Sequence, residues 1–261
     1  MKSLQIWFLL FWLFSVCSLF ASFFVQDEWT KVFDVSPGDT VNQAVQLYNP
    51  SDRVVNVRVY QSDYITNDSG EDVYLPAGSY HRSNADWIRV QSSIRLQPNQ
   101  TFPLPFLINV PTDRDLKGSY WSDLLIEEVI ETTDFDPEII AINLRYAIQI
   151  ICNVVNTEQI QLAFENIHYG VDEVSLSLRN TGNSWFQASI KMDVYDDRAE
   201  LVGSFLSERN RVYPSAVKRV HIPVRLSRFT NYYAIIVADC GNGNIFGHQV
   251  SFIITTPDTG Q

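Results

Sequence analysis

Apolar and polar residues alternate with a period of two over much of this sequence, and this alternation constrains the fold more than any other feature. It is clearest between Thr101 and Val110, in the run TFPLPFLINV. Side chains along a β-strand point to opposite faces in turn, so the run predicts a half-buried strand. Pro103 and Pro105 cannot donate to a neighbouring strand, so we expect the start of this strand at a sheet edge or bulge. The same alternation recurs at residues 55–59, 174–178, 190–194 and 220–226, and helical spacing is almost absent. The sequence therefore predicts an all-β protein.

Clusters of Gly, Pro, Asn, Asp and Ser separate the predicted strands at short intervals. They lie at residues 36–39, 49–52, 67–70, 97–99, 180–183 and 241–244. Many short strands with such turns favour an antiparallel sandwich, and each half of the chain has room for roughly seven strands of an immunoglobulin-like domain. We predict two tandem immunoglobulin-like β-sandwich domains, at residues 27–152 and 153–261.

The N-terminal 26 residues carry Lys2 and no other charge before Asp27. A stretch of this kind predicts an export signal. It is either a cleaved signal peptide, with small-residue cleavage sites at residues 16–18 or 19–21, or an uncleaved anchor, since about 20 apolar residues span a bilayer. We therefore expect an exported protein of the periplasm or cell envelope, which meets a membrane only through this segment.

The net charge of the chain limits the kinds of partner that it can bind. The chain has 19 Lys and Arg against 30 Asp and Glu, a net charge of −11. This charge opposes binding to phosphate backbones, so nucleic acid is not an expected partner.

Once the leader is removed, only the cysteines Cys152 and Cys240 remain. They can pair as a disulfide in an oxidising compartment or lie apart as two buried thiols, and their spacing does not decide between these alternatives.

The sequence lacks the motifs that usually carry catalysis or bind metals. It has no G-x-S-x-G, no H-E-x-x-H, no phosphate-binding glycine loop and no paired C-x-x-C. Residues 67–72 offer oxygen ligands but not the spacing of a calcium loop, so we interpret them as a hairpin tip. The charged run Asp113–Lys117 is interpreted as a solvated loop between two strands. We expect no enzyme activity, no cofactor and no metal site.

The run IIAINLRYAIQIIC, at residues 139–152, is the most unusual segment of the chain. At about 3.3 Å per residue it predicts a strand about twice the usual length of five or six residues. We expect it to run the full height of the first domain and to lead into the second. One face of this strand is formed by Ile140, Ile142, Leu144, Tyr146, Ile148, Ile150 and Cys152.

Several segments resemble the PapD-like periplasmic pilus chaperones. Residues 111–115 read PTDRD and are followed by Tyr120-Trp121, similar to the Pro-x-Asp-Arg-Glu and Phe-Trp segment of that family. The Asn49-Pro50 turn and the Arg145-Tyr146 strand lie in the matching order. The chain departs from the family pattern in two places: Ala147 stands where the family has a lysine, and Lys117-Gly118 are two extra residues.

The resemblance implies two immunoglobulin-like domains set at an angle, in which the last strand of the first domain binds an incomplete pilus subunit. In that mode, backbone hydrogen bonds supply affinity and alternate side chains fill a groove of the client. The residues that would contact the partner here are Ile140, Ile142, Leu144, Arg145 and Tyr146. From the residues alone, the alternative is that these side chains face the core of their own domain.

We therefore hold three hypotheses for function. The first is a chaperone-like protein that assembles a bacterial surface structure by edge-strand pairing. The second is a membrane-anchored structural or adhesive envelope protein. The third is a carbohydrate-binding protein that uses exposed aromatic side chains such as Trp87, Trp121 and Trp185.

Overall fold

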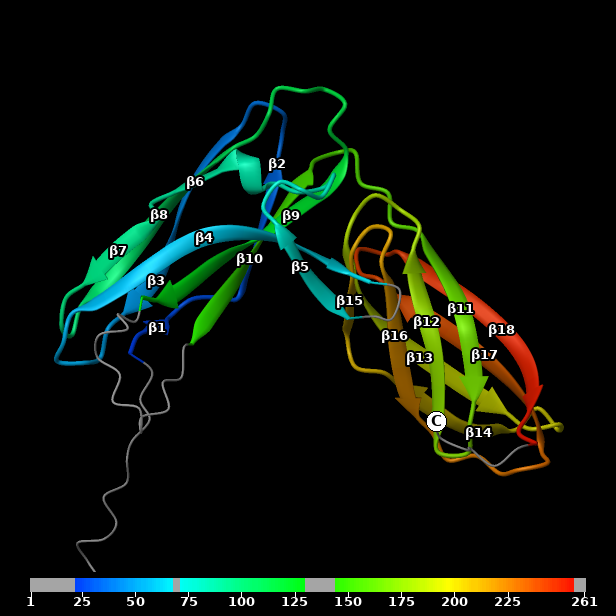
Figure 1. Ribbon diagram of the computed structural model, residues 1–261. Helices are drawn as coiled ribbons and strands as arrows, with labels where there is room; N and C mark the ends of the chain where they lie inside the picture. The colour runs from blue at the N-terminus through cyan, green and yellow to red at the C-terminus, as the bar shows by residue number, and fades with distance from the viewer. Residues whose placement is uncertain (1–21, 68–70, 130–143, 256–261) are drawn as a thin grey trace, which may run out of the picture.

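A computed structural model describes residues 22–67, 71–129 and 144–255. Most of the predicted leader, and the partner-binding candidates Ile140 and Ile142, lie outside these residues. Apart from one 3-10 turn at Ala85–Trp87, every regular element in the described ranges is a β-strand. The predicted all-β class with tandem sandwich domains is confirmed (Figure 1).

The first domain packs two sheets face to face. The first sheet has the order β1 (Phe24–Val25), β3 (Thr40–Tyr48), β8 (Thr101–Asn109) and β6 (Ile88–Val90). The second has the order β2 (Thr30–Val35), β10 (Arg145–Val154), β9 (Gly118–Glu128), β4 (Val55–Thr66) and β5 (Asp72–Pro76), and β7 (Ser93–Leu96) also pairs with β4. The β2–β10 pair is parallel, whereas the other pairs of this domain's sheets are antiparallel.

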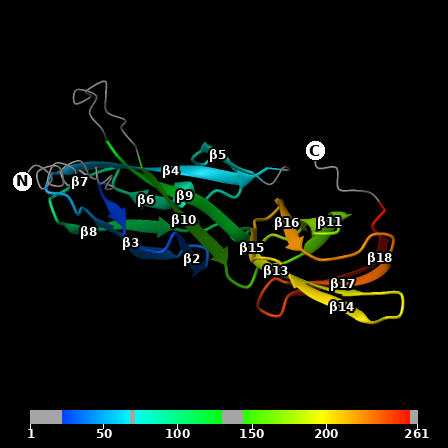
Figure 2. The same ribbon diagram turned by 90° about the horizontal axis from the view of Figure 1, so that it is seen from below.

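The second domain is a smaller sandwich. One sheet has the order β11 (Leu162–Tyr169), β12 (Glu173–Asn180) and β16 (Val217–Pro223). The other has the order β14 (Leu201–Leu206), β13 (Phe186–Tyr195), β17 (Asn231–Asp239) and β18 (Ile245–Ile253), and β15 (Asn210–Val212) also pairs with β13. The chain passes directly from β10 into the second domain, and the two domains meet at an angle (Figures 1 and 2).

The predicted alternation is confirmed by which side chains are buried. In β8, Leu104, Phe106 and Ile108 are buried in the first core, while Pro103 and Pro105 lie on the opposite face. β3 pairs along the whole of β8, but β6 pairs only from Phe106 on, so the start of β8 has one open edge. The two prolines therefore lie where no second neighbour needs their N–H, as expected.

Residues before Asp27, the predicted start of the first domain, also pack against this domain. Phe23 is buried in the core, and Phe24–Val25 pair with β3. The Tyr146 hydroxyl donates to the Phe23 carbonyl at 2.9 Å. Both proposed cleavage sites end at or before Ala21, so cleavage at either of them would leave these contacts intact.

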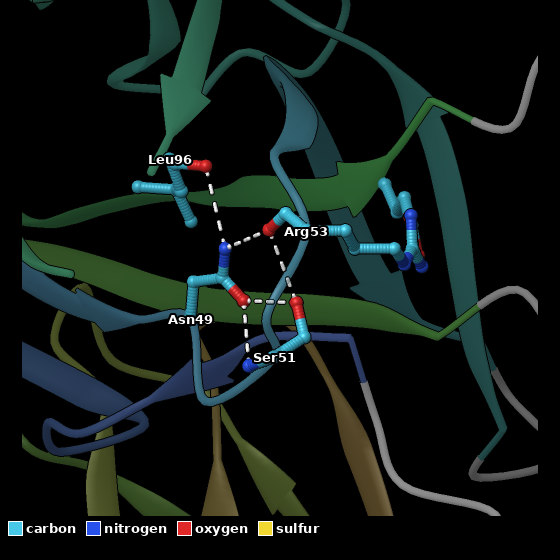
Figure 3. A network of polar contacts seen from close by, with 5 residues as sticks. Asn49, Ser51, Arg53 and Leu96 are labelled. Atoms are coloured by element: carbon cyan, nitrogen blue, oxygen red, sulfur yellow. Dashed lines mark hydrogen bonds and ion pairs between the residues drawn. The ribbon is translucent and has the colours of Figure 1, made fainter. Parts of the chain in front are cut away.

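Each domain has a buried asparagine at the end of a strand: Asn49 directly follows β3, and Asn180 is the last residue of β12. Asn49 donates from its amide to the carbonyls of Arg53, Leu96 and Gln97 at 2.8, 3.3 and 3.0 Å, and accepts from Ser51. Figure 3 shows its contacts with Arg53, Leu96 and Ser51. In the second domain Asn180 donates to the carbonyls of Ser184 and Val212 and accepts from Gly182. Both side chains satisfy backbone groups that would otherwise be buried without partners.

The two cysteines are free and buried in separate domains. Cys152 lies in the core of the first domain and Cys240 in the core of the second. Burial raises the pKa of Cys152 to about 12 and that of Cys240 to about 11. The possible disulfide is therefore not formed, because each thiol is packed inside its own sandwich. Among the residues that the model describes, no helix has the length and apolar character needed to cross a membrane.

Candidate functional site

The first four residues of strand β10 have no described strand beside them along one edge. On one side β9 pairs with β10 along its whole length. On the other side the parallel ladder with β2 covers only Gln149–Val154, and no strand within the described ranges pairs with Arg145–Ile148. We call Arg145–Ile148 the β10 edge.

The backbone of the β10 edge points outward at alternate residues. The N–H of Gln149 donates to the carbonyl of Trp29 at 2.9 Å, which defines the β2 side of the strand. Backbone groups of successive strand residues point to opposite sides, so Arg145 and Ala147 direct their N–H and C=O groups to the same side as Gln149. Beyond the start of β2 at Thr30, no described strand lies on that side, so an incoming strand could pair there.

The side chains of the predicted partner-binding face divide at Tyr146. Leu144 is 41 % exposed, whereas Tyr146 is buried and its ring lies 5.0 Å from that of Phe23. Beyond Tyr146 the same face belongs to the core of the first domain, with Ile148, Ile150 and Cys152 all buried. From Tyr146 onward these side chains therefore face their own domain.

Arg145 is held within its own sheet by Glu127. Its Nε donates to Glu127 Oε2 at 2.8 Å, and the Nε of Arg58 donates to Glu127 Oε1 at 3.0 Å. The two guanidinium groups lie 5.9 and 5.1 Å from the centre of the Tyr60 ring. Burial acts to raise the pKa of Glu127, but the hydrogen bonds from Arg58 and Arg145 outweigh it and keep that pKa below its ordinary value. The cluster fixes the register of β4, β9 and β10 beside the open edge.

Toward the C-terminal end of β10, the outer face of the same sheet is covered by the second domain. Tyr64, Trp121 and Ile151 are buried in one hydrophobic cluster with residues of the second domain. The ring centre of Trp121 lies 4.6 Å from that of Tyr213, and the Tyr64 and Tyr213 hydroxyls are hydrogen-bonded. The indole N–H of Trp121 donates to the Tyr64 carbonyl at 2.9 Å. These aromatic contacts tie the two domains together.

Gly118 brings the backbones of the two domains into contact. A Cβ atom at this position would lie 2.0 Å from the carbonyl oxygen of Asn183, and the φ angle of Gly118 is +71°. The next residue, Ser119, donates its N–H to that same carbonyl at 2.9 Å. In the sequence, Gly118 appears only as one of two extra residues in the resemblance to the PapD-like chaperones. Its role in the structure is to permit this close approach, which depends on a loop 65 residues away in the sequence.

A polar cleft of about 430 Å³ lies at the junction between the domains. Gln149 of β10 reaches into it and accepts hydrogen bonds from Arg211 and from Thr30. Besides Arg211, the charged residues that line the cleft are Arg209, Lys218 and Asp72. Three cationic side chains against one carboxylate make the cleft locally positive in a chain of net charge −11, and this charge favours anionic groups.

Asp123 is a buried carboxylic acid beside this cleft. It faces Gln149 across the β9–β10 ladder, and its Oδ1 has no hydrogen-bond partner within the described part of the chain. Burial is the main cause that raises its pKa to about 7; the charge of Asp72 adds to the rise and that of Arg211 opposes it. The alternation of β9 places Asp123 on the outer face. No sequence signal reveals that the second domain borders this face.

Two other sets of residues named from the sequence lie elsewhere. The run Asp113–Lys117 is an exposed loop, in which Asp113 accepts from the N–H of Asp115 at 2.9 Å, so the expected solvated loop is confirmed. The third hypothesis named Trp87, Trp121 and Trp185 as exposed aromatic side chains. This is wrong for Trp87 and Trp121, which are buried, and Trp185 is only partly exposed. No group of three or more potential metal ligands occurs among the residues described.

The comparisons with known proteins point to one fold. No family model and no curated protein match this sequence. Among solved structures, a chain of the chaperone–tip adhesin complex of CFA/I fimbriae biogenesis has a TM-score of 0.51 and 15% identity, and the match covers 90% of this chain and 99% of that one. The fold is that of the PapD-like fimbrial chaperones.

Two further structures are similar to this chain with lower scores. The class 5 fimbriae chaperone CfaA has a TM-score of 0.49 and 14% identity, and the match covers 90% of this chain and 100% of that one. The CsuC–CsuE chaperone–tip subunit complex of Acinetobacter baumannii has a TM-score of 0.48 and 12% identity, over 90% and 99% of the two chains. The match at a TM-score of 0.51 confirms, for the fold, the resemblance to PapD-like chaperones expected from Pro111–Asp115 and Tyr120-Trp121.

Proposed function

We propose that this chain is a non-catalytic, exported protein-binding protein that acts as a chaperone-like factor in the assembly of a bacterial surface structure. The PapD-like fold supports this class of function, since one similar structure is a complex of a chaperone with a tip adhesin. A subunit of the surface structure is the proposed partner. The periplasm is the proposed compartment, because the apolar N-terminal segment is typical of an export signal.

The observation that carries this proposal is the open β10 edge. Arg145 and Ala147 direct backbone donors and acceptors to a side where no described strand lies. An extended segment of a client can add to this edge, with main-chain hydrogen bonds supplying the affinity. The exposed side chain of Leu144 extends the apolar face beyond the core, and we propose that it fills the client's groove together with Ile140 and Ile142.

In this proposal the other two candidate residues have supporting roles. Tyr146 anchors the strand to the first domain through Phe23, so it positions the edge and does not enter the client. Arg145 is already paired with Glu127 and holds the strand in register with β9. Neither residue supplies a free cation for a client carboxylate, and the positive charge near this strand comes from the junction cleft.

The test replaces Ala147 by proline. The substitution removes an N–H that points to the open side and leaves the β9 ladder intact, so the variant is expected to fold. Ala147→Val is the matched control, because it keeps the N–H and favours a strand. Each protein is purified from the envelope of the producing cell, and co-purifying proteins are quantified by mass spectrometry. A partner identified in this way is then titrated with the purified variants.

We expect the proline variant to lose a partner that the valine variant retains, with affinity reduced by at least about tenfold through the lost hydrogen bond and the blocked edge. Circular dichroism and thermal unfolding check that both variants are folded. If the folded proline variant binds the partner as well as the wild type does, pairing through the β10 edge is wrong.

A further inference from the structure

Strand β18 reads almost the same in both directions. Its sequence is IFGHQVSFI, with Gln249 at the centre. The matched positions are Ile245 with Ile253, Phe246 with Phe252, Gly247 with Ser251, and His248 with Val250. If two copies of this strand met in antiparallel order about Gln249, an identical or similarly sized residue would stand opposite nearly every position.

The outer edge of β18 is free to make such a pairing. β18 is the last strand of its sheet and pairs only with β17 among the described strands. The N–H of Cys240 donates to the carbonyl of Asn244 at 2.9 Å, so even-numbered residues bond toward β17. Odd-numbered residues, including Gln249, therefore direct their N–H and C=O groups away from β17. Ile245 and Ile253, at the two ends of this series, are 65 % and 45 % exposed.

The other edge strands of this domain carry features that oppose pairing, and β18 carries none. β16 contains Lys218, Arg219 and Pro223, and a register shift between Glu165 and His168 interrupts β11. β14 is shorter, and its ladder with β13 shifts register. β18 keeps one register over all nine residues and contains no proline, acid, lysine or arginine. A long, uncharged edge of this type is a template for another strand.

We propose that β18 pairs with β18 of a second copy of this chain, about a two-fold axis that passes beside Gln249. In this arrangement Gln249 faces its own counterpart, and Ile245 of each copy faces Ile253 of the other. The odd-numbered residues form the hydrogen-bonded pairs and exchange both N–H and C=O groups. The sheets of the two second domains become continuous.

The near-palindrome is what favours a second copy over a different protein. A two-fold interface is self-complementary, so residues equally distant from its axis must match. A foreign strand would need no such matching along β18. The absence of charge in this strand also means that two chains of net charge −11 do not place like charges opposite each other along it.

A charge exchange at the proposed axis tests this pairing. The full chain is purified in mild detergent, as the producing cell processes it. Its molecular mass is then measured by sedimentation from micromolar to near-millimolar concentration. We expect a reversible dimer. Gln249→Lys and Gln249→Glu each place two like charges opposite one another, so each variant should dimerise at least about tenfold more weakly. An equimolar mixture of the two variants should recover the dimer, because lysine then faces glutamate.

Two controls separate the edge from general effects of charge and of the lost side chain. Val202→Lys adds the same charge at β14, the opposite edge of the sheet, and should leave the dimer unchanged. Gln249→Thr removes the hydrogen bond between Gln249 and the Tyr233 hydroxyl without adding charge, and should also dimerise. A wild-type chain that stays monomeric throughout would overturn the proposal. So would a Gln249→Lys variant that dimerises like the wild type, or a mixture that fails to recover.

Discussion

The buried carboxyl group of Asp123 should make the stability of this protein depend strongly on pH. Its pKa is raised from 3.8 to about 7 in the folded protein, chiefly by burial. In the unfolded chain the pKa returns to its ordinary value. Between these two values the folded state binds a proton that the unfolded state has released, so the free energy of unfolding falls as pH rises.

The magnitude follows from the size of the shift. One pKa unit corresponds to about 1.4 kcal/mol, so a shift of about three units costs about 4 kcal/mol once the carboxyl group is fully ionised. Below the unfolded pKa the cost is absent. Roughly 2 kcal/mol of it is present at pH 5, and a further 2 to 3 kcal/mol, roughly, is lost between pH 5 and pH 8.

The perturbation is Asp123→Asn, which keeps the shape of the side chain and removes its titration. Urea unfolding of wild type and variant at pH 5 and pH 8 gives the two free energies. The stability of the variant relative to the wild type should rise by roughly 2 to 3 kcal/mol from pH 5 to pH 8. Groups that titrate elsewhere cancel in this difference. A difference that is the same at both pH values would refute the reasoning, because it would mean that Asp123 titrates alike in the folded and unfolded states.

Three further perturbations probe the junction and the cores. Gly118→Ala should destabilise the protein by about 2–4 kcal/mol, measured by urea unfolding, because its Cβ would strike the backbone of the second domain at a positive φ. Asn49→Ala and Asn180→Ala should each cost about 2–4 kcal/mol in the same assay, since several buried backbone groups lose their partners. Cys152 and Cys240 should stay unmodified by a thiol reagent at pH 8 in the folded protein and react only on unfolding, because both are buried with pKa values near 12 and 11.

Local sequence pattern was sufficient to predict features that depend on neighbouring residues. The alternation in Thr101–Val110 predicted both the buried face of β8 and the open edge at its prolines. The alternation in β10 likewise placed Tyr146, Ile148 and Ile150 on one buried face. These features follow from the two-residue period of a strand and from the chemistry of proline, which act over a few positions.

Features that depend on the second domain could not be read in this way. Trp121 and Ile151 occupy the face that alternation marks as the outer one, yet both are buried because the second domain covers it. The same covering raises the pKa of Asp123 and makes a glycine necessary at position 118. The alternation of apolar and polar residues in the first domain does not indicate where the second domain packs. The prediction that Trp121 is an exposed aromatic residue was therefore wrong.

The β10 edge and the outer edge of β18 differ in symmetry, and that difference suggests different partners. The β10 edge is flanked on one side by the Glu127 cluster and on the other by the end of β2, so its two ends are chemically unlike. An asymmetric edge of this kind suits a partner other than the chain itself. The β18 edge is uncharged and nearly palindromic, which suits a second copy. Because the edges belong to different sandwiches, occupation of one leaves the other open, and two copies joined at β18 would each keep a free β10 edge.

We therefore expect Ala147→Pro to abolish partner binding without changing the dimer, and Gln249→Lys to weaken the dimer without changing the affinity of each chain for its partner. Loss of both activities in either variant would mean that the two edges are not independent.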